Sequence, residues 1–360
     1  MTEKAPDIQE MAFEQHHYAR SRRNREDLRG TLYFRDDDRH IIRKVPGFPA
    51  IKRSYRLGEG ITRLFGNECF WAEEKLDGYN ARIFKYDGLL FGATRGGFIC
   101  PFTTEWARIW EKDLNLGAFF YEYPEYTLCG EVCGDNPYNW QRDPDLPEGA
   151  HFFIFEITAP DGTFLPPEKR YEILNAYGLP GVGVLGKFSR AETDDLFQTL
   201  RELNHRGREG TVLKDTAGRR RMKFVTPSTD IEDLKDTLQI GFDLDAGYFF
   251  NRYLRAAIFV REFGLDEDEY ARRIGRAFLD GIPRAGEYRE SRKKYLIHVL
   301  KKSTWETLRD MLRGSVQIRT DDMEPVMIKG REMLRVRFRR IYQKSTHRFR
   351  RILKGHLHED

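Results

Sequence analysis

Hydrophobic and polar positions alternate over short distances in the first two thirds of the chain. Between residues 47 and 227, runs of aromatic and branched side chains alternate with polar ones and are separated by turn-forming residues. This spacing is typical of short strands. The pairs Asp87-Gly88 and Asp161-Gly162 suit tight turns between antiparallel strands. The pattern predicts antiparallel sheets across this region.

Helical spacing appears in two places within that region and dominates the rest of the chain. One amphipathic stretch runs from about Pro167 to Tyr177 and ends before Gly178. A second runs from about Ser189 to His205, with a glycine two residues later. Each glycine predicts the end of a helix. After residue 227, long charged and amphipathic segments predict a mainly helical C-terminal region.

These changes of pattern predict four regions. Residues 1–46 are polar and arginine-rich, and they predict a basic N-terminal arm that is helical or partly ordered. Residues 47–228 form the strand-rich domain, and residues 229–325 form a helical domain. Residues 326–360 form a basic helical segment. The fold class expected from this order is α+β.

Composition restricts the kind of protein without naming it. The chain has 360 residues and a formal net charge of +4, and no apolar run approaches the ~20 residues that span a bilayer. The arginine-rich N-terminus lacks the apolar core of a signal peptide. The four cysteines of the chain match no zinc spacing, so we expect them to be reduced thiols. We therefore expect a cytoplasmic protein with no membrane partner.

The C-terminal segment carries most of the local excess of positive charge. Residues 329–354 contain eleven lysines or arginines and one acidic residue, Glu332. Leu334, Phe338 and Ile341 recur at a spacing that predicts one helix with an apolar stripe. A solvated helix face would explain such a run, but its local concentration favours contact with RNA phosphates. The arginines predicted to make that contact are Arg335, Arg337, Arg339, Arg340, Arg350 and Arg351.

Candidate chemistry is concentrated in the segment from Glu74 to Arg82. It places a lysine (Lys75), a carboxylate (Asp77), a glycine and an arginine in one short loop. This set of groups suits attack of a lysine amine on a nucleotide α-phosphate. The attacking amine must be neutral, whereas an ordinary lysine with a pKa of ~10.4 is almost fully protonated at neutral pH. A divalent metal or a cationic neighbour is therefore expected near Lys75.

Five further motifs occur in order along the chain and carry the missing groups. They are Thr94-Arg95-Gly96-Gly97, Cys129-Gly130-Glu131-Val132-Cys133-Gly134, Phe153-Ile154-Phe155-Glu156-Ile157, Glu209-Gly210-Thr211-Val212-Leu213-Lys214 and Arg221-Met222-Lys223-Phe224. The ordered series resembles the motif set of the covalent nucleotidyltransferase superfamily, which contains DNA ligases, RNA ligases and mRNA capping enzymes. A lone Lys-x-Asp-Gly motif would be weak, because three fixed positions recur by chance. The order of the whole series makes the resemblance specific.

The resemblance implies a role for each motif residue. Lys75 would be the nucleophile, and Lys214 and Lys223 would be catalytic phosphate contacts. The residues expected to bind the nucleotide are Glu74, Lys75, Asn80, Arg82, Arg95, Glu131, Phe155, Lys214 and Lys223. Glu131 and Glu209 would hold Mg²⁺ or Mn²⁺, because carboxylates are ligands that these cations prefer, or would contact the ribose. Phe155 would stack on adenine, although a phenylalanine in an alternating strand could equally belong to the core.

Three details refine or depart from that pattern. Asp77 is expected to position the lysine or the metal shell. The last motif begins with Arg221 where many relatives have lysine, which keeps the charge and changes its geometry. Phe155 is followed by Glu156 where many relatives have aspartate. Surface ion pairs are the alternative for Arg82 and Arg95.

The resemblance also implies an architecture and a reaction. DNA ligases and capping enzymes carry a small five-stranded barrel after a nucleotidyltransferase core with an ATP-grasp-like fold, and no such strand pattern is visible after residue 227. A helical C-terminal region looks most like the homodimeric archaeal-type RNA ligases. The expected activity is ATP-dependent joining of RNA 5′-phosphate and 3′-hydroxyl ends by a homodimer. A DNA ligase, a capping-type guanylyltransferase and a non-catalytic RNA-binding relative remain as alternatives.

Overall fold

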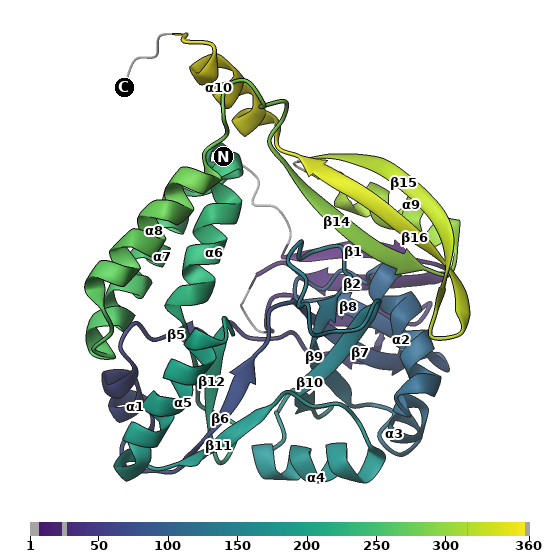
Figure 1. Cartoon of the computed structure of the whole chain (residues 1–360). Coiled ribbons are helices and arrows are strands. Elements are labelled where there is room, and N and C mark those ends of the chain that lie inside the picture. Colours follow the sequence, from purple (N-terminus) through teal and green to yellow (C-terminus); the bar gives the residue numbers. More distant parts are fainter. Residues whose placement is uncertain (1–6, 24–26, 315, 357–360) are drawn as a thin grey trace, which may run out of the picture.

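Two sheets form the centre of the computed structural model, which describes residues 7–23, 27–314 and 316–356 (Figure 1). Their strands are β5 (Lys52–Arg53), β6 (Phe70–Lys75), β7 (Tyr79–Tyr86), β8 (Leu89–Thr94), β9 (Thr127–Gly134), β10 (Ala150–Thr158), β11 (Val184–Phe188), β12 (Gly210–Asp215) and β13 (Arg221–Val225). One sheet has the order β10-β9-β7-β8, and the other has the order β11-β6-β12-β13-β5. Every pair is antiparallel except the short pair of β13 and β5. The predicted α+β core is confirmed.

Helices cover the outer faces of these sheets. They are α1 (Leu57–Phe65), α2 (Pro101–Asp113), α3 (Leu116–Glu122), α4 (Pro167–Tyr177), the 3₁₀ turn η1 (Arg190–Glu192) and α5 (Thr193–His205). The predictions for α4 and α5 are confirmed, and Gly178 ends α4 in the left-handed conformation. Helices α1, α2 and α3 were not expected. In α1, Gly58 and Gly60 lower helix propensity, and the buried stripe of Leu57, Ile61 and Phe65 stabilises the helix.

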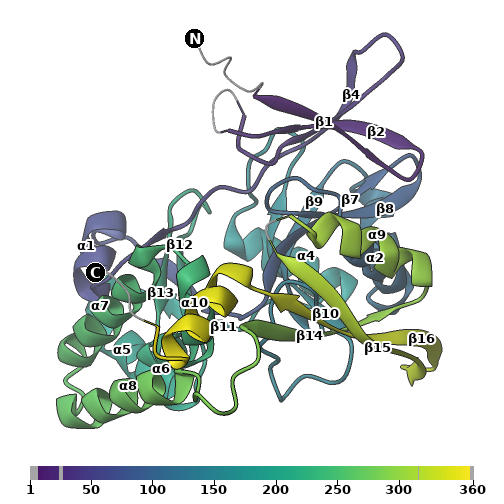
Figure 2. The same ribbon diagram turned by 90° about the horizontal axis from the view of Figure 1, so that it is seen from above.

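The predicted helical or partly ordered N-terminal arm is wrong for the described residues. A four-stranded antiparallel sheet takes its place, in the order β1-β2-β3-β4. Its strands are β1 (Ile8–Phe13), β2 (His16–Ser21), β3 (Leu32–Arg35) and β4 (Ile41–Val45). Leu32, Phe34 and Val45 are buried against Phe84 and Phe91 of the core. The many arginines in this segment hide the alternation of buried and exposed positions in the sequence, and burial against the core stabilises the strands. Figure 2 shows the sheet at one edge of the molecule.

The region after residue 227 begins with the expected helices. They are α6 (Pro227–Thr237), the 3₁₀ turn η2 (Leu238–Asp243), α7 (Ala246–Glu262) and α8 (Glu267–Gly281). These three α-helices stand together on one side of the molecule (Figure 1). Arg255 of α7 pairs with the buried Asp230 of α6, which locks the two helices together.

The expectation of helix through to the C-terminus is wrong for most residues between 292 and 341, which form strands, although two helices also occur after residue 292. The chain forms β14 (Arg292–Val299), α9 (Lys302–Leu312), β15 (Gln317–Ile328), β16 (Arg331–Ile341) and α10 (Gln343–Leu353). The three strands form one sheet in the order β14-β16-β15, which we call the C-terminal sheet. Along β16, Met333, Val336, Phe338 and Ile341 are buried, so their separations of three, two and three residues fit neither period cleanly. Pairing on both edges of β16 decides in favour of strand.

The C-terminal sheet shares a core with the nucleotidyltransferase-like region. Tyr295, Val336 and Phe338 belong to the same buried cluster as Trp106 and Phe152. The indole of Trp106 donates to the backbone oxygen of His298 at 2.9 Å. The sheet is therefore held firmly against the domain that carries the motifs. Within the described parts of the chain, no helix is long and apolar enough to cross a membrane.

Candidate active site

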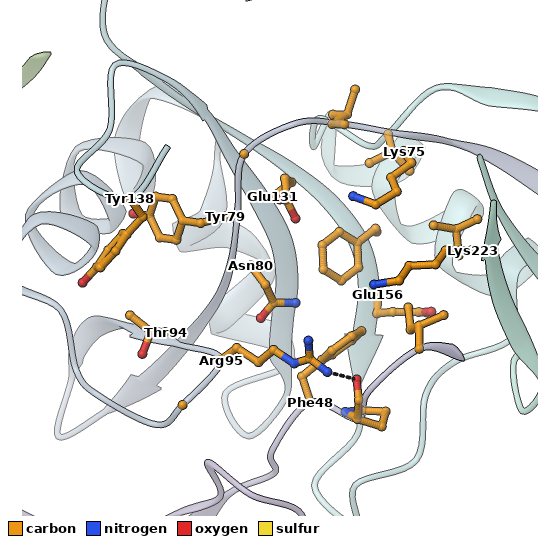
Figure 3. Close-up of a pocket in the computed structure, with 18 of the residues that line it drawn as sticks. Phe48, Lys75, Tyr79, Asn80, Thr94, Arg95, Glu131, Tyr138, Glu156 and Lys223 are labelled. Atoms are coloured by element: carbon orange, nitrogen blue, oxygen red, sulfur yellow. Dashed lines mark hydrogen bonds between the residues drawn. The ribbon is translucent and has the colours of Figure 1, made fainter. Parts of the chain in front are cut away.

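A cavity of about 660 Å³ is lined by strands of both central sheets (Figure 3). This volume lies in the range typical of small-molecule sites. Eight of the predicted nucleotide-binding residues line it: Glu74, Lys75, Asn80, Arg95, Glu131, Phe155, Lys214 and Lys223. Phe155 faces this cavity and is only partly buried, so it does not belong to the core. We call this space the nucleotide pocket.

Lys75 stands at the end of β6, where the chain turns towards β7. Gly78 lies in this turn, and a Cβ atom there would lie 2.4 Å from the Val132 oxygen and 2.9 Å from Glu131 Cγ. Only glycine allows this close approach, which brings the segment from Glu74 to Arg82 against β9. We call this segment the lysine loop. Pairing of β7 with β9 then sets Asn80 opposite Glu131. The turn thus brings two motifs that are distant in sequence into one site.

The Lys75 amine is held by a carboxylate in this structure. Its Nζ donates to Glu209 Oε2 at 2.7 Å. Burial by itself lowers the pKa of Lys75, but Glu209 and Glu131 outweigh it, and the net pKa lies above the ordinary value. Without a cation on those carboxylates, the amine stays protonated and cannot attack. The positive charge predicted near Lys75 would therefore have to act by neutralising Glu209 and Glu131.

The carboxylates around Lys75 are themselves crowded. Burial, with added repulsion from Glu209 and Asp77, raises the pKa of Glu131 to about 8. Burial and the nearby charges of Glu209 and Asp233 raise the pKa of Asp77 to about 7. Burial is the main cause of both shifts, and a cation bound nearby would oppose them by favouring the charged carboxylates.

This electrostatic arrangement fits a divalent cation at Glu131 and Glu209. Among the residues that the structure describes, no group of three or more histidine, cysteine or acidic side chains could hold a metal alone. Mg²⁺ commonly binds through one or two carboxylates together with water and substrate phosphates. Two glutamates with a nucleotide between them would meet that requirement.

Lys214 lies at the centre of a buried network of charges. Its Nζ is 2.7 Å from Glu73, 3.0 Å from Glu156 and 2.7 Å from the backbone oxygen of Phe155. Arg170 of α4 bonds to the same two glutamates. Burial and the Arg170 charge lower the pKa of Lys214 despite the two glutamates. The network keeps a lysine and its counter-ions together in the wall of the pocket.

Two members of this network are absent from the motif set. Arg170 is fully buried and comes from the amphipathic helix α4, whose sequence shows no motif. Strand alternation places Glu73 on the same face of β6 as Lys75, so its position near the site could have been predicted from the sequence. Nothing comparable points to Arg170.

The two departures from the family pattern meet in the same network. An Arg221 nitrogen lies 3.3 Å from Glu156 Oε1, and its guanidinium lies over the ring of Phe164 at 4.1 Å. Arg221 does not line the nucleotide pocket, whereas Glu156 does. The longer carboxylate of Glu156 therefore reaches both Lys214 and Arg221.

Arg82 is not placed to contact a nucleotide. Its guanidinium is completely buried and donates to the backbone oxygens of Pro46, Gly30 and Thr94. The predicted nucleotide contact is corrected to a structural role that ties the N-terminal segment to β8. Arg95, in contrast, is exposed at the pocket and donates to the Pro49 oxygen at 3.0 Å (Figure 3).

The predicted positive face of the C-terminal segment is largely neutralised. Arg335, Arg337 and Arg339 lie on β16, not on a helix, and each pairs with acidic side chains. The partners are Glu148 and Glu324 for Arg335, Asp322 and Glu324 for Arg337, and Asp321 and Glu290 for Arg339. The acidic run of β15 therefore supplies counter-charges that the count from residue 329 to 354 left out.

The remaining three arginines differ among themselves. Arg340 donates to the backbone oxygen of Pro137 and lies over the ring of Tyr295 at 4.7 Å. Arg350 on α10 donates to the Arg289 oxygen at 2.8 Å, and Arg351 is exposed. Of the six predicted arginines, Arg337 on β16 and Arg350 and Arg351 on α10 are exposed, and Arg337 is paired with two acidic side chains.

Lys223 should make phosphate binding depend on pH. Burial, with added repulsion from Arg53 and Lys75, lowers the pKa of Lys223 to about 8. The amine is charged below that pH and neutral above it, so affinity for a non-transferable α,β-methylene ATP analogue should fall on the order of 10-fold between pH 7 and 9. Calorimetric titration at several pH values measures it. Lys223→Arg should flatten the dependence, and an equally steep fall in that variant would assign it to another group.

Comparisons with known proteins agree with this geometry. Residues 68–225 match the family described as RNA ligase, and residues 237–356 match the family described as Ligase Pab1020 C-terminal region. A structure described as an archaeal ATP-dependent RNA ligase is 29% identical, with a TM-score of 0.86 over 98% of this chain and 94% of that one. A putative ATP-dependent DNA ligase from Aquifex aeolicus is also 29% identical, with a TM-score of 0.88 over 98% and 97% of the two chains.

A curated relative extends the comparison at the sequence level. An uncharacterised protein of Methanocaldococcus jannaschii is 35% identical over 261 residues, which are 70% of this chain and 64% of that protein. A two-sheet pocket with a lysine at the end of β6 and ordered motifs on its walls, together with these matches, identifies a ligase of the nucleotidyltransferase fold. Within that class, the chain belongs to the archaeal-type ATP-dependent RNA ligase family.

Proposed function

We propose that the protein joins an RNA 5′-phosphate to an RNA 3′-hydroxyl through a lysyl-AMP intermediate. The observation that carries the proposal is the position of Lys75, which lines the nucleotide pocket together with Glu131, Lys214 and Lys223. Its amine also bonds to Glu209, which lines the neighbouring cavity. First, the Lys75 nitrogen forms a bond to the ATP α-phosphorus, pyrophosphate leaves, and the amine loses a proton. AMP then passes to the RNA 5′-phosphate, and attack by the 3′-hydroxyl releases it.

The side chains have distinct tasks in that sequence. Lys214 and Lys223 offset phosphate charge, and Asn80 and Arg95 orient the nucleotide from the opposite wall. Phe155 stacks on adenine. Glu131 and Glu209 would hold Mg²⁺ or Mn²⁺, which when bound neutralises phosphate charge and the two carboxylates. Glu209 contacts Lys75 directly, so its charge also orients the amine.

The function is tested by supplying both kinds of nucleic acid. The protein is incubated with labelled ATP or GTP and a divalent cation, and then with 5′-phosphorylated RNA or nicked DNA. We expect AMP on the protein, then AMP on the RNA 5′ end, then joined RNA. Sealing of nicked DNA without RNA joining would favour the DNA ligase alternative, and a GMP adduct would favour a guanylyltransferase. Absence of any adduct would leave a binding protein.

We further propose that α7 and α8 form the contact of a homodimer. Phe250, Phe278 and Leu279 on these two helices are large apolar side chains that are 66%, 44% and 68% exposed. A two-fold contact would bury them. Light scattering should give about twice the 42.5 kDa of one chain, and Leu279→Glu should lower that mass. A monomer at micromolar concentration in moderate salt contradicts the proposal.

A further inference from the structure

Residues 135–148 form a loop that lies between the lysine loop and the C-terminal sheet. We call it the bridging loop. It connects β9 to β10 and lines both cavities that meet at Lys75: Tyr138 lines the nucleotide pocket, and residues 141–146 line a neighbouring cavity of about 750 Å³. None of the motifs includes it.

The bridging loop contacts the lysine loop through neighbouring side chains: Tyr138 packs against Tyr79 with ring centroids 4.6 Å apart, and Asn139 bonds to Asp77. Asn139 Nδ2 donates to Asp77 Oδ1 at 2.9 Å. The amide oxygen of the same residue accepts from the Gln141 backbone nitrogen at 3.0 Å, which shapes the loop. The two halves of the amide thus have different tasks. The donor acts on Asp77, two residues from Lys75, and the acceptor acts within the loop.

The other side of the loop is fixed to the C-terminal region. Arg340 of β16 donates to the Pro137 oxygen. Trp140 packs edge-on against Tyr295 at 6.4 Å, and its indole donates to Asp236 of α6 at 3.1 Å. These groups surround the short segment from which Asn139 projects, so movement of the C-terminal sheet would shift Asn139 relative to Asp77.

We propose that the bridging loop couples the C-terminal sheet to nucleotide transfer, with Asn139 as the residue that positions the Asp77 carboxylate beside Lys75. The inference rests on the proposed function, because it concerns the rate of lysyl-AMP formation. Asn139 does not line the nucleotide pocket, so its loss should change the rate of transfer more than the binding of ATP. Arg340 acts at one remove, through the loop.

Asn139→Asp separates positioning from loop structure. Aspartate keeps the acceptor for Gln141 and the size of the side chain, but it replaces the donor to Asp77 by a second carboxylate. We expect the rate constant for AMP adduct formation at saturating ATP to fall about tenfold or more, with the KM for ATP within twofold of wild type. In Asn139→Ala, the rate constant for adduct formation should fall by a similar factor. Wild-type rates in Asn139→Asp would show that only the shape of the loop matters and would overturn the positioning role.

Arg340→Met tests the coupling to the C-terminal sheet. Methionine keeps apolar contact with Tyr295 and removes the donor to Pro137. We expect adduct formation to slow at least threefold. Arg331→Met is the matched control on the same strand, because Arg331 pairs with Asp113 at the other end of β16. Equal rates in both variants would overturn the coupling.

The rate of adduct formation is measured first in the wild-type protein. Thermal melting of every variant checks that each one is folded. If wild type forms no adduct, the proposed function fails. If wild type forms the adduct and Asn139→Asp and Arg340→Met form it equally fast, only the bridging-loop inference fails.

Discussion

Lys75→Ala is expected to abolish the covalent AMP adduct completely. The amine is the nucleophile of the first step, and among the pocket lysines only Lys75 stands at the turn between β6 and β7 beside Glu209. Lys214 is enclosed by Glu73 and Glu156, and Lys223 approaches from β13, so neither can replace it. Intact-protein mass spectrometry after incubation with ATP and Mg²⁺ measures the adduct. The wild-type adduct should be acid-labile and stable in alkali, as a phosphoramidate is.

A distant lysine provides the control for that experiment. Lys235→Ala removes a half-exposed amine of α6 that pairs only with Glu232 among the described residues. It should form the adduct at the wild-type rate. An AMP adduct that persists in Lys75→Ala would refute the assignment of the nucleophile.

Arg170→Met is expected to cause the largest loss of stability among the network variants. Arg170 is completely buried and pairs with Glu73 and Glu156, which are also buried. Methionine preserves much of the volume but leaves less positive charge against two carboxylates. Breaking a buried pair in this way costs ~3–5 kcal/mol. The measurement is the midpoint of urea unfolding, monitored by tryptophan fluorescence.

The adjacent residue offers a matched control. Lys169→Met changes an exposed lysine of α4 that pairs with Glu172, and surface pairs of this kind contribute ~0–1 kcal/mol. Its urea midpoint should stay close to wild type. If Arg170→Met also unfolds at the wild-type midpoint, the guanidinium is not needed to balance the buried glutamates.

Local chemistry could be predicted from the sequence where a residue type leaves few alternatives. The order of the motifs around Lys75 predicted a shared pocket, and pairing of β7 with β9 brings Asn80 and Glu131 together there. The helix α4 was predictable because a proline begins it and Gly178 ends it. In these cases, short-range geometry agrees with the tertiary structure.

The errors arose where distant partners decide the structure. The apolar spacing of β16 fits neither the helical nor the strand period cleanly, and pairing with its two neighbouring strands favours the extended form. Arg82 lies in a motif, but three backbone oxygens from separate segments surround it. Arg340 lies in a basic run, yet it holds the bridging loop. No pattern within a window of ten or twenty residues contains that information.

The shared core of the C-terminal sheet and the central sheets bears on how the molecule comes apart. Val336, Phe338 and Trp305 are almost completely solvent-excluded within the same cluster as Trp106 and Phe152. Cutting the chain after the last motif would leave the apolar face of α2 that packs against α9 and β14 open to water, at ~25 cal/mol for each Å² uncovered. We therefore expect a segment cut in this way to be less stable than the same residues in the full chain. The catalytic motifs precede the C-terminal region in the chain, but we expect both parts to unfold in one cooperative transition.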